Sequence, residues 1–208
     1  IASQPVLDHV SLDVSRQGIL GIQGPSGRGK STMLKLLMRY WDPDSGTISL
    51  SDVPLPQVDA GWRRRVQTMM GQETYLFDGT IRSNAGGDSA DSSDSDLAHD
   101  IPDSVLREAL AKASALELVD ALPNGLDTQV GELGGRLSEG EKQRIGLARM
   151  FLRDADLVLF DEPTSRLDAY NESVILGSVN NLAEQGSAVV LVSHRDSTMR
   201  VADRILRM

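Results

Sequence analysis

A glycine-rich turn near the start of the chain has the residue types and spacing needed to bind phosphate. Residues 24–31 (GPSGRGKS) satisfy the pattern G-x-x-x-x-G-K-[ST], and they lie between an expected strand over residues 18–23 and an expected helix over residues 30–40. Glycines let successive main-chain N–H groups converge on phosphate oxygens, and the start of a helix adds free donors and a favourable dipole. An ordinary glycine turn is the alternative for the pattern alone, but the strand–turn–helix context favours a nucleotide site.

Two residues of this turn have separate roles in the predicted nucleotide site. Lys30 is expected to reach the β- and γ-phosphates, and the Ser31 hydroxyl is expected to take a coordination position on Mg²⁺. The residues predicted to bind the nucleotide are Gly24, Pro25, Ser26, Gly27, Arg28, Gly29, Lys30, Ser31 and Thr32.

Two adjacent carboxylates follow a second apolar run. Residues 157–160 (LVLF) predict a buried strand, and Asp161 and Glu162 stand where that strand ends. Such a pair is by itself most often the start of a solvated loop. In an enzyme with a phosphate-binding turn, however, one acid at this point holds Mg²⁺ and the next polarises the attacking water. We therefore assign Asp161 to magnesium and Glu162 to the water.

A third segment has a structural interpretation before any functional one. Residues 137–144 (LSEGEKQR) open an expected helix over residues 139–153, and Ser138 and Glu141 form the S-x-x-E pattern of a capping box. A capped helix start is what most such patterns mean.

The elements that must position these residues alternate between strand-like and helix-like segments. Short apolar runs over residues 18–23, 157–160 and 188–192 predict buried strands. An Ala- and Leu-rich stretch over residues 105–122 predicts a helix, and residues 139–153 predict another. A turn over residues 42–46 precedes another expected strand over residues 47–50. This order predicts an α/β fold with a mainly parallel sheet, in which the chemistry gathers where strands end.

Composition excludes several classes of function for this chain, which is expected to form one domain over residues 1–208. The absence of cysteine excludes disulfides, thiolate zinc sites and a cysteine nucleophile. The formal net charge of −9 argues against a broad surface for nucleic acid, so no nucleic-acid partner is expected. A Ser/Asp tract over residues 86–96 lacks the register of an EF-hand calcium loop, and it is expected to be a solvated loop.

Taken together with the other motifs, residues 137–144 resemble the L-S-G-G-Q signature of ATP-binding cassette (ABC) proteins. Residues 66–84 resemble the glutamine-loop region of that family, with Gln72 as the loop glutamine. Residues 165–168 (SRLD) resemble its D-loop, with Asp168, and His194 resembles its switch histidine. The resemblance covers essentially the whole chain. It implies a P-loop NTPase (RecA-like) core over residues 1–79 and 155–208, with an antiparallel β subdomain, and a helical subdomain over residues 80–154.

The resemblance also implies that two such domains enclose ATP and Mg²⁺ between them. The second nucleotide-binding domain can be identical to this one or different. The implied roles fall into three groups: Lys30, Gln72, Glu162 and His194 act in catalysis, Ser31, Gln72 and Asp161 hold Mg²⁺, and Ser138, Glu139 and Gly140 contact the ATP held by the other domain.

Three further segments resemble the exporter branch of the family: residues 39–46 (RYWDPDSG), 76–81 (LFDGTI) and 128–132 (TQVGE). In exporters of that type, this domain follows a membrane domain on the same chain. The resemblance therefore implies an ATPase that powers transport, located at the cytoplasmic face of the cell membrane and excised here from a longer chain. The membrane domain is expected to dock at residues 74–80.

The chain departs from the family pattern in its signature. Glu139 stands where the family usually has its first glycine, and Glu141 replaces the glutamine. A carboxylate near a triphosphate is expected to repel it unless the carboxylate is turned away. The aromatic residue that stacks on adenine in exporters is expected to precede Ile1.

Three alternatives remain open at this point. One is a soluble ABC ATPase of DNA maintenance, which the acidic charge and the lack of a long heptad array disfavour. Another is a non-hydrolysing nucleotide sensor, which the altered signature suggests. The third is the detached ATPase subunit of an importer.

Overall fold

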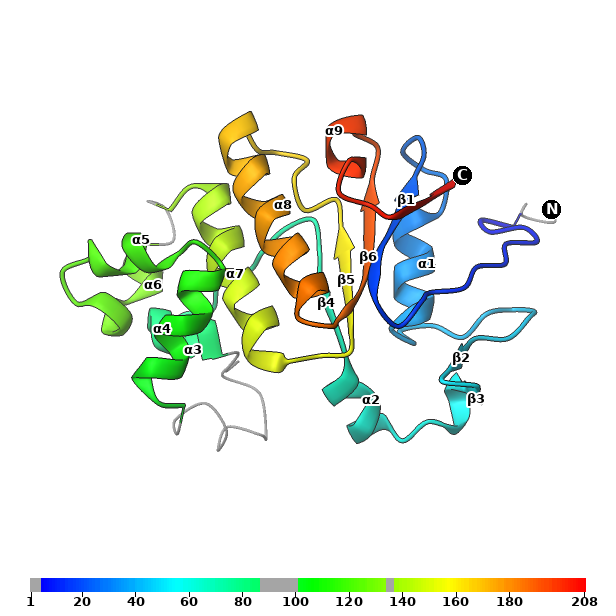
Figure 1. Ribbon diagram of the computed structural model, residues 1–208. Coiled ribbons are helices and arrows are strands. Elements are labelled where there is room, and N and C mark those ends of the chain that lie inside the picture. Colours follow the sequence, from blue (N-terminus) through cyan, green and yellow to red (C-terminus); the bar gives the residue numbers. More distant parts are fainter. Residues whose placement is uncertain (1–4, 87–100, 134–136) are drawn as a thin grey trace.

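The computed structural model describes residues 5–86, 101–133 and 137–208. Its main sheet has five strands in the order β4-β5-β6-β1-β7, and every neighbouring pair is parallel (Figure 1). The strands are β1 (Gly18–Gln23), β4 (Gln67–Met70), β5 (Leu157–Asp161), β6 (Ala188–Ser193) and β7 (Arg204–Arg207). The α/β fold with a mainly parallel sheet, predicted from the alternation of segments, is thereby confirmed.

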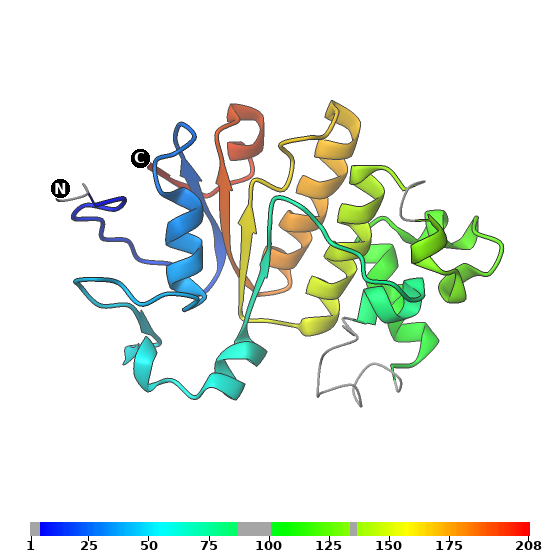
Figure 2. The same ribbon diagram turned by 180° about the vertical axis from the view of Figure 1, so that it is seen from behind.

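Helices cover both faces of this sheet, because its central strands are apolar on both sides. Leu157 and Leu159 of β5 pack toward helix α1 (Lys30–Leu37), while Val158 and Phe160 pack on the opposite face. That opposite face is covered by α7 (Glu139–Arg153) and α8 (Ala169–Glu184), and the arrangement is visible from both sides in Figures 1 and 2. The parallel strands therefore all end on one edge of a sheet buried between helices.

A small antiparallel hairpin lies beside the sheet. It consists of β2 (Ser49–Leu50) and β3 (Val53–Pro54), and it is followed by the 3₁₀-helix η1 (Leu55–Gln57) and by α2 (Ala60–Val66). The expected strand over residues 47–50 is therefore shorter than predicted. The predicted helix over residues 30–40 also ends early, at Leu37, because Arg39 adopts a left-handed conformation with φ of 55°.

Most of the remaining helices form a group between residues 81 and 153. They are α3 (Ile81–Gly86), α4 (Asp103–Lys112), α5 (Leu116–Asp120), η2 (Gly125–Asp127), α6 (Val130–Leu133) and α7. The prediction of one helix over residues 105–122 is wrong, because Ser114 has a positive φ of 53° and separates α4 from α5. Most of the Ser/Asp tract lies outside the described residues. A last short helix, α9 (Asp196–Met199), follows β6.

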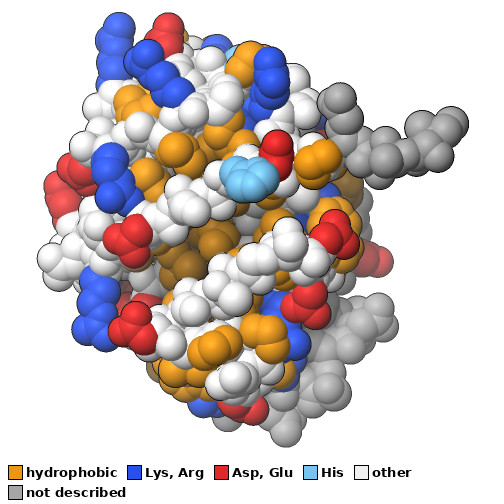
Figure 3. All heavy atoms as spheres, turned by 90° about the vertical axis from the view of Figure 1, so that its right-hand side faces the viewer, with side chains coloured by type: hydrophobic (Ala, Val, Ile, Leu, Met, Phe, Trp, Pro, Cys, Tyr) orange, Lys and Arg blue, Asp and Glu red, His pale blue; other side chains and the backbone are white. Residues whose placement is uncertain are grey.

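The core between α1 and the sheet is smaller than the core on the opposite face of the sheet. Figure 3, which views the molecule from the right-hand side of Figure 1, shows hydrophobic side chains in the middle of that side, with charged side chains around them. The partly buried residues that pack on this smaller core are Leu7, Leu12, Val14, Leu37, Met38, Met69, Leu206 and Met208. Within the described part of the chain, no helix is both long enough and apolar enough to cross a membrane.

Candidate active site

The glycine-rich turn connects the end of β1 to the start of α1. Gly27 and Gly29 have left-handed φ angles of 82° and 85°, which glycine adopts without strain. A Cβ on Gly29 would lie 2.7 Å from Leu7 Cδ2, so the N-terminal segment also requires glycine here. Lys30, the first residue of α1, is 4% exposed and donates hydrogen bonds from Nζ to the carbonyls of Gly24 (2.7 Å) and Pro25 (2.8 Å). The Lys30 ammonium is therefore bound by main-chain carbonyls of the turn that precedes it.

The acidic pair at the end of β5 lies directly beside this turn. Asp161 accepts a hydrogen bond of 2.9 Å from the Ser31 hydroxyl, and its burial raises the pKa of its carboxyl above the usual value. Glu162 has a left-handed φ of 49°, and its N–H donates to the carbonyl of Val192 (2.9 Å). A non-glycine residue in this conformation is uncommon and is often found at active sites.

Glu162 is the point at which three predicted residues meet. Its Oε1 lies 3.9 Å from Lys30 Nζ, and its Oε2 lies 2.9 Å from Nδ1 of His194. His194 follows the last residue of β6, the strand that pairs with β5. The parallel sheet therefore brings the lysine, the glutamate and the histidine together from three separate parts of the chain.

A cavity of about 300 Å³ opens over Lys30 and Glu162, and His194 is not among the residues that line it. Its lining includes most of the predicted phosphate-binding residues, together with the acidic pair and Gln72: Ser26, Gly27, Gly29, Lys30, Ser31, Thr32, Gln72, Asp161 and Glu162. Arg28 is exposed and is not among the lining residues. Gln72 also donates from Nε2 to the Ser165 hydroxyl (3.4 Å). Val6 lines the cavity too, and nothing in the sequence pattern pointed to it.

The oxygen atoms in this cavity fit a magnesium ion bound together with a nucleotide. Ser31 and Asp161 present a hydroxyl and a carboxylate side by side. Within the described ranges, no group of three or more His, Cys, Asp or Glu side chains could hold a metal ion by itself. Mg²⁺ typically takes one or two protein oxygens and completes its shell with phosphates and water.

The signature segment lies outside this cavity. Neither Ser138, Glu139 nor Gly140 lines it. The predicted capping box is confirmed: Ser138 N–H donates to Glu141 Oε2 (2.7 Å), and Glu141 N–H donates to Ser138 Oγ (3.3 Å). Glu139 Oε1 lies 3.2 Å from Lys142 Nζ. Both additional carboxylates of the signature therefore have partners within their own helix.

Asp168 also lies outside the cavity, and its side chain caps the start of α8. It accepts a hydrogen bond of 2.8 Å from Asn171 N–H, and this bond is the main cause that lowers the pKa of the Asp168 carboxyl. Asn171 also accepts from Arg144 of α7 (2.8 Å). A Cβ on Gly140 would lie 2.8 Å from Asn171 Oδ1, so the signature glycine allows α7 to approach α8 closely.

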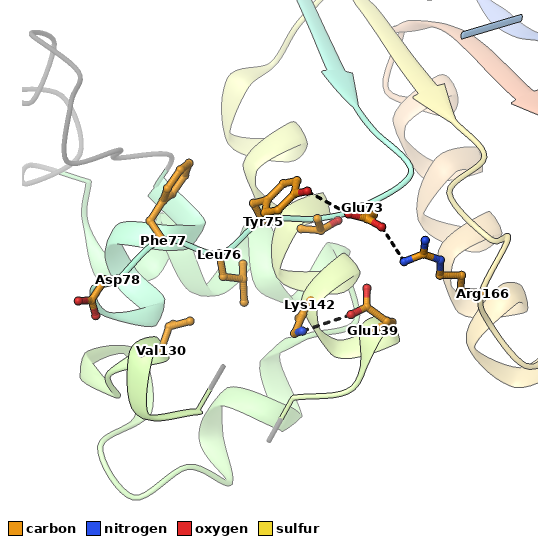
Figure 4. Close-up of a pocket in the computed structure, with 11 residues that line it drawn as sticks. Glu73, Tyr75, Leu76, Phe77, Asp78, Val130, Glu139, Lys142 and Arg166 are labelled. Carbon is orange, nitrogen blue, oxygen red and sulfur yellow. Dashed lines mark hydrogen bonds and ion pairs between the residues drawn. The ribbon is translucent and has the colours of Figure 1, made fainter. Parts of the chain in front are cut away.

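A second cavity of about 380 Å³ lies between residues 73–78 and α7 (Figure 4). On one side Glu73 pairs with Arg166 (2.8 Å) and accepts from the Tyr75 hydroxyl (3.0 Å). On another side lies the Glu139–Lys142 pair of the signature helix. This cavity is therefore rimmed by the glutamine-loop region, the D-loop and the signature.

Residues 75–84 are held against α7 by a half-buried arginine. Arg149 of α7 donates to the carbonyl of Tyr75 (3.0 Å) and to Asn84 Oδ1 (3.0 Å), and it lies over the ring of Phe77 at 5.3 Å. Burial lowers the pKa of the Arg149 guanidinium to about 10. Sequence patterns did not single out Arg149, because its contacts are with residues more than 60 positions away.

Comparisons with known proteins agree with this geometry. The family model described as ABC transporter matches residues 7–165. A probable ABC transporter ATP-binding/permease protein of Haemophilus influenzae is 43% identical over 203 residues, which are 98% of this chain and 35% of that protein. An ATP-dependent lipid A-core flippase of Vibrio vulnificus is 37% identical over 208 residues, which are 99% of this chain and 34% of that protein. The chain thus spans about a third of the length of these curated relatives.

A solved structure of a bacterial Atm1-family ABC exporter with ATP bound has the same fold. The two superpose with a TM-score of 0.79 at 33% identity, over 92% of this chain and 32% of the exporter chain. The predicted resemblance and the predicted P-loop core are thereby confirmed. The family model covers most of the chain, and the relatives align with nearly all of it. This chain belongs to the ABC transporter family.

Proposed function

We propose that this chain binds ATP and Mg²⁺ in the cavity at the ends of β1 and β5, and that its hydrolysis of ATP powers transport by a membrane exporter. The main observation in support is that Lys30, Glu162 and His194 lie together beside the Ser31–Asp161 pair. The exporter relatives support the coupling to transport and a location at the cytoplasmic face of a membrane.

The proposed phosphate site is the glycine-rich turn, residues 24–32. Its N–H groups and the start of α1 bind the phosphate oxygens, and Lys30 exchanges the carbonyls of Gly24 and Pro25 for the β- and γ-phosphates. Ser31, Asp161 and Gln72 would hold Mg²⁺, which would neutralise phosphate charge. The buried Asp161 carboxyl, whose pKa is raised by burial, ionises more readily once a cation lies beside it.

In the proposed reaction Glu162 is the general base. A water oxygen forms a bond to the γ-phosphorus, the bond from that phosphorus to the β–γ bridging oxygen breaks, and the proton of the water passes to the Glu162 carboxylate. His194, 2.9 Å from Glu162, orients this carboxylate and contacts the γ-phosphate.

Two partners complete the proposed assembly. The first partner is a second nucleotide-binding domain, either a copy of this chain or a different one. The ATP bound by that domain is contacted by Ser138, Glu139 and Gly140 of this chain, and Asp168 lies near the interface. The second partner is a transmembrane domain on the same, longer polypeptide. It docks in the second cavity, where Tyr75 and Phe77 are 70% and 39% exposed. We further propose that the core comprises residues 1–79 and 155–208, and that residues 80–154 form the helical subdomain.

The decisive test is Glu162→Gln in the purified chain, with Glu184→Gln as the matched control. Glu184 is an exposed residue at the end of α8, away from the cavity. Loss of the general base should lower phosphate release by about 10²- to 10⁴-fold. Binding of MgATP should persist, and an ATP-bound dimer should accumulate in size-exclusion chromatography. Lys30→Ala should instead abolish saturable binding. Equal phosphate release by Glu162→Gln and Glu184→Gln would refute the role of Glu162.

A further inference from the structure

A buried carboxylate lies behind the candidate active site, on helix α8. Glu172 is 7% exposed, and three side chains satisfy it. Its Oε1 accepts hydrogen bonds from the hydroxyls of Ser197 (2.8 Å) and Thr198 (2.9 Å), and its Oε2 lies 3.1 Å from Arg195 Nη1. A carboxylate is buried at such low exposure only when it is paired and hydrogen-bonded. All three partners belong to the segment that follows His194.

The same cluster also reaches the loop that follows Glu162. Arg195 donates from Nη1 to the carbonyl of Thr164 (2.8 Å). The hydroxyls of Thr164 and Thr198 lie 2.9 Å apart, and both residues are fully buried. Glu172 and Arg195 therefore join three parts of the fold: α8, the loop after β5 and the loop after β6.

These two loops are the ones that carry Glu162 and His194. The pairing of β5 with β6 ends at Asp161 and Val192, and one further main-chain bond joins Glu162 N–H to Val192. Beyond that point the sheet no longer holds the loops together. The Glu172 cluster contacts them just past the reacting residues, at Thr164 on one side and at Arg195 to Thr198 on the other.

We infer that Glu172 and Arg195 are positioning residues, which hold Glu162 and His194 at the separation that hydrolysis requires. The inference rests on the roles proposed above for Glu162 and His194. A buried ion pair commonly adds little net stability, since desolvation offsets the attraction. The pair does, however, restrict the geometry of the loops it joins, and small displacements of reacting groups slow a reaction strongly.

The test is Glu172→Gln, which keeps the volume of the side chain and removes its charge. We expect kcat for ATP hydrolysis to fall about 10- to 100-fold, while the Kd for a MgATP analogue changes less than twofold. The matched control is Val179→Ala, two turns further along the same helix and fully buried in the larger core. It should lower the Tm but leave kcat within twofold, when assayed well below the unfolding temperature. A kcat loss in Val179→Ala as large as that in Glu172→Gln, at equal loss of Tm, would overturn the inference.

Two additional variants keep the result decisive if Glu172→Gln does not fold. Ser197→Ala removes one hydrogen bond at an exposed position, and we expect a drop in kcat of about threefold. The double variant Glu172→Gln/Arg195→Gln should be no slower than the slower single variant, because both residues act as one unit. Suppose that Glu162→Gln abolishes turnover, but that Ser197→Ala or a folded Glu172→Gln has the kcat of the parent chain. The positioning role of Glu172 is then overturned, while the proposed role of Glu162 stands. If Glu162→Gln retains turnover, the proposed role of Glu162 fails instead.

Discussion

Two pairs of acidic residues in this chain have opposite surroundings. Asp161 and Glu162 end a strand, and their partners come from distant segments: Ser31 is 130 positions from Asp161, and His194 is 32 positions from Glu162. Glu139 and Glu141 begin a helix, and each finds a partner three positions away. Acids at a helix start are favoured by the helix dipole and the free N–H groups there.

The difference separates the chemical role proposed for Asp161 and Glu162 from the structural role of Glu139 and Glu141. The strand-end pair faces a cavity beside a lysine and a hydroxyl, and one of its members has a raised pKa because it is buried. In the helix-start pair, Glu141 caps the helix and Glu139 forms an ion pair with Lys142 of the same helix. Hence the altered signature is compatible with an active ATPase, because neither additional carboxylate is left without a partner.

The largest expected difference between the two pairs is in turnover. Asp161→Asn removes the carboxylate proposed to hold Mg²⁺, and we expect kcat to fall by about 10²-fold or more. Glu139→Gln should change kcat less than a few-fold under the same conditions. The measurement is phosphate release over a Mg²⁺ titration. A Mg²⁺ dependence of Asp161→Asn identical to that of the parent chain would contradict the assignment.

The same substitution should have the opposite effect on stability without nucleotide. Because burial raises the pKa of Asp161 in the folded chain, the stability it contributes is complete below its ordinary pKa of 3.8 and is lost as the pH rises through the raised value. At pH 7 the folded chain therefore carries the cost of a buried charge, which asparagine does not. We expect Asp161→Asn to raise the Tm by roughly 2–4 °C at pH 7, and the difference to shrink toward pH 4. A lower Tm for the variant at pH 7 would show that burial of this charge is not costly.

A smaller effect is expected at the helix start. Glu141→Ala removes one half of the capping box, which should cost about 1 kcal/mol of unfolding free energy. Urea denaturation measures this cost. Glu139→Ala, two residues earlier in the same helix and outside the capping box, is the control and should cost less. Equal stabilities for Glu141→Ala and the parent chain would mean that the cap contributes nothing.

The smallest expected effect concerns the half-buried ion pair of the signature, Glu139 and Lys142. Lys142→Gln leaves the Glu139 carboxylate without the partner at 3.2 Å, so the signature should repel the ATP of the other domain more strongly. We expect the ATP concentration for half-maximal dimer formation to rise about two- to fivefold. The double variant Glu139→Gln/Lys142→Gln should restore the parent value. If the double variant stays as weak as Lys142→Gln, Lys142 acts on the nucleotide directly and not through Glu139.

Sequence reasoning was most successful where the determining contacts are local. The strands over residues 18–23 and 188–192, the helix over residues 139–153 and the Ser138 cap were all predicted within one residue. It failed at the single helix over residues 105–122, because the left-handed conformation of Ser114 has no strong signal in the residue type. It also did not find Val6, Arg149 or Glu172, since their partners are far away along the chain.

The sequence by itself determined the glycine-rich turn proposed to bind phosphate, because glycines, lysine and serine within eight consecutive residues specify the backbone and its charge locally. It also determined which strands would be buried and where acidic residues would follow them. Only the tertiary structure decided that Glu162 contacts His194, and that Glu172 contacts Arg195, which in turn contacts Thr164. Those contacts depend on β5 and β6 lying side by side in register, and the pairing of strands that are distant in sequence is set by packing of the whole sheet rather than by any local pattern.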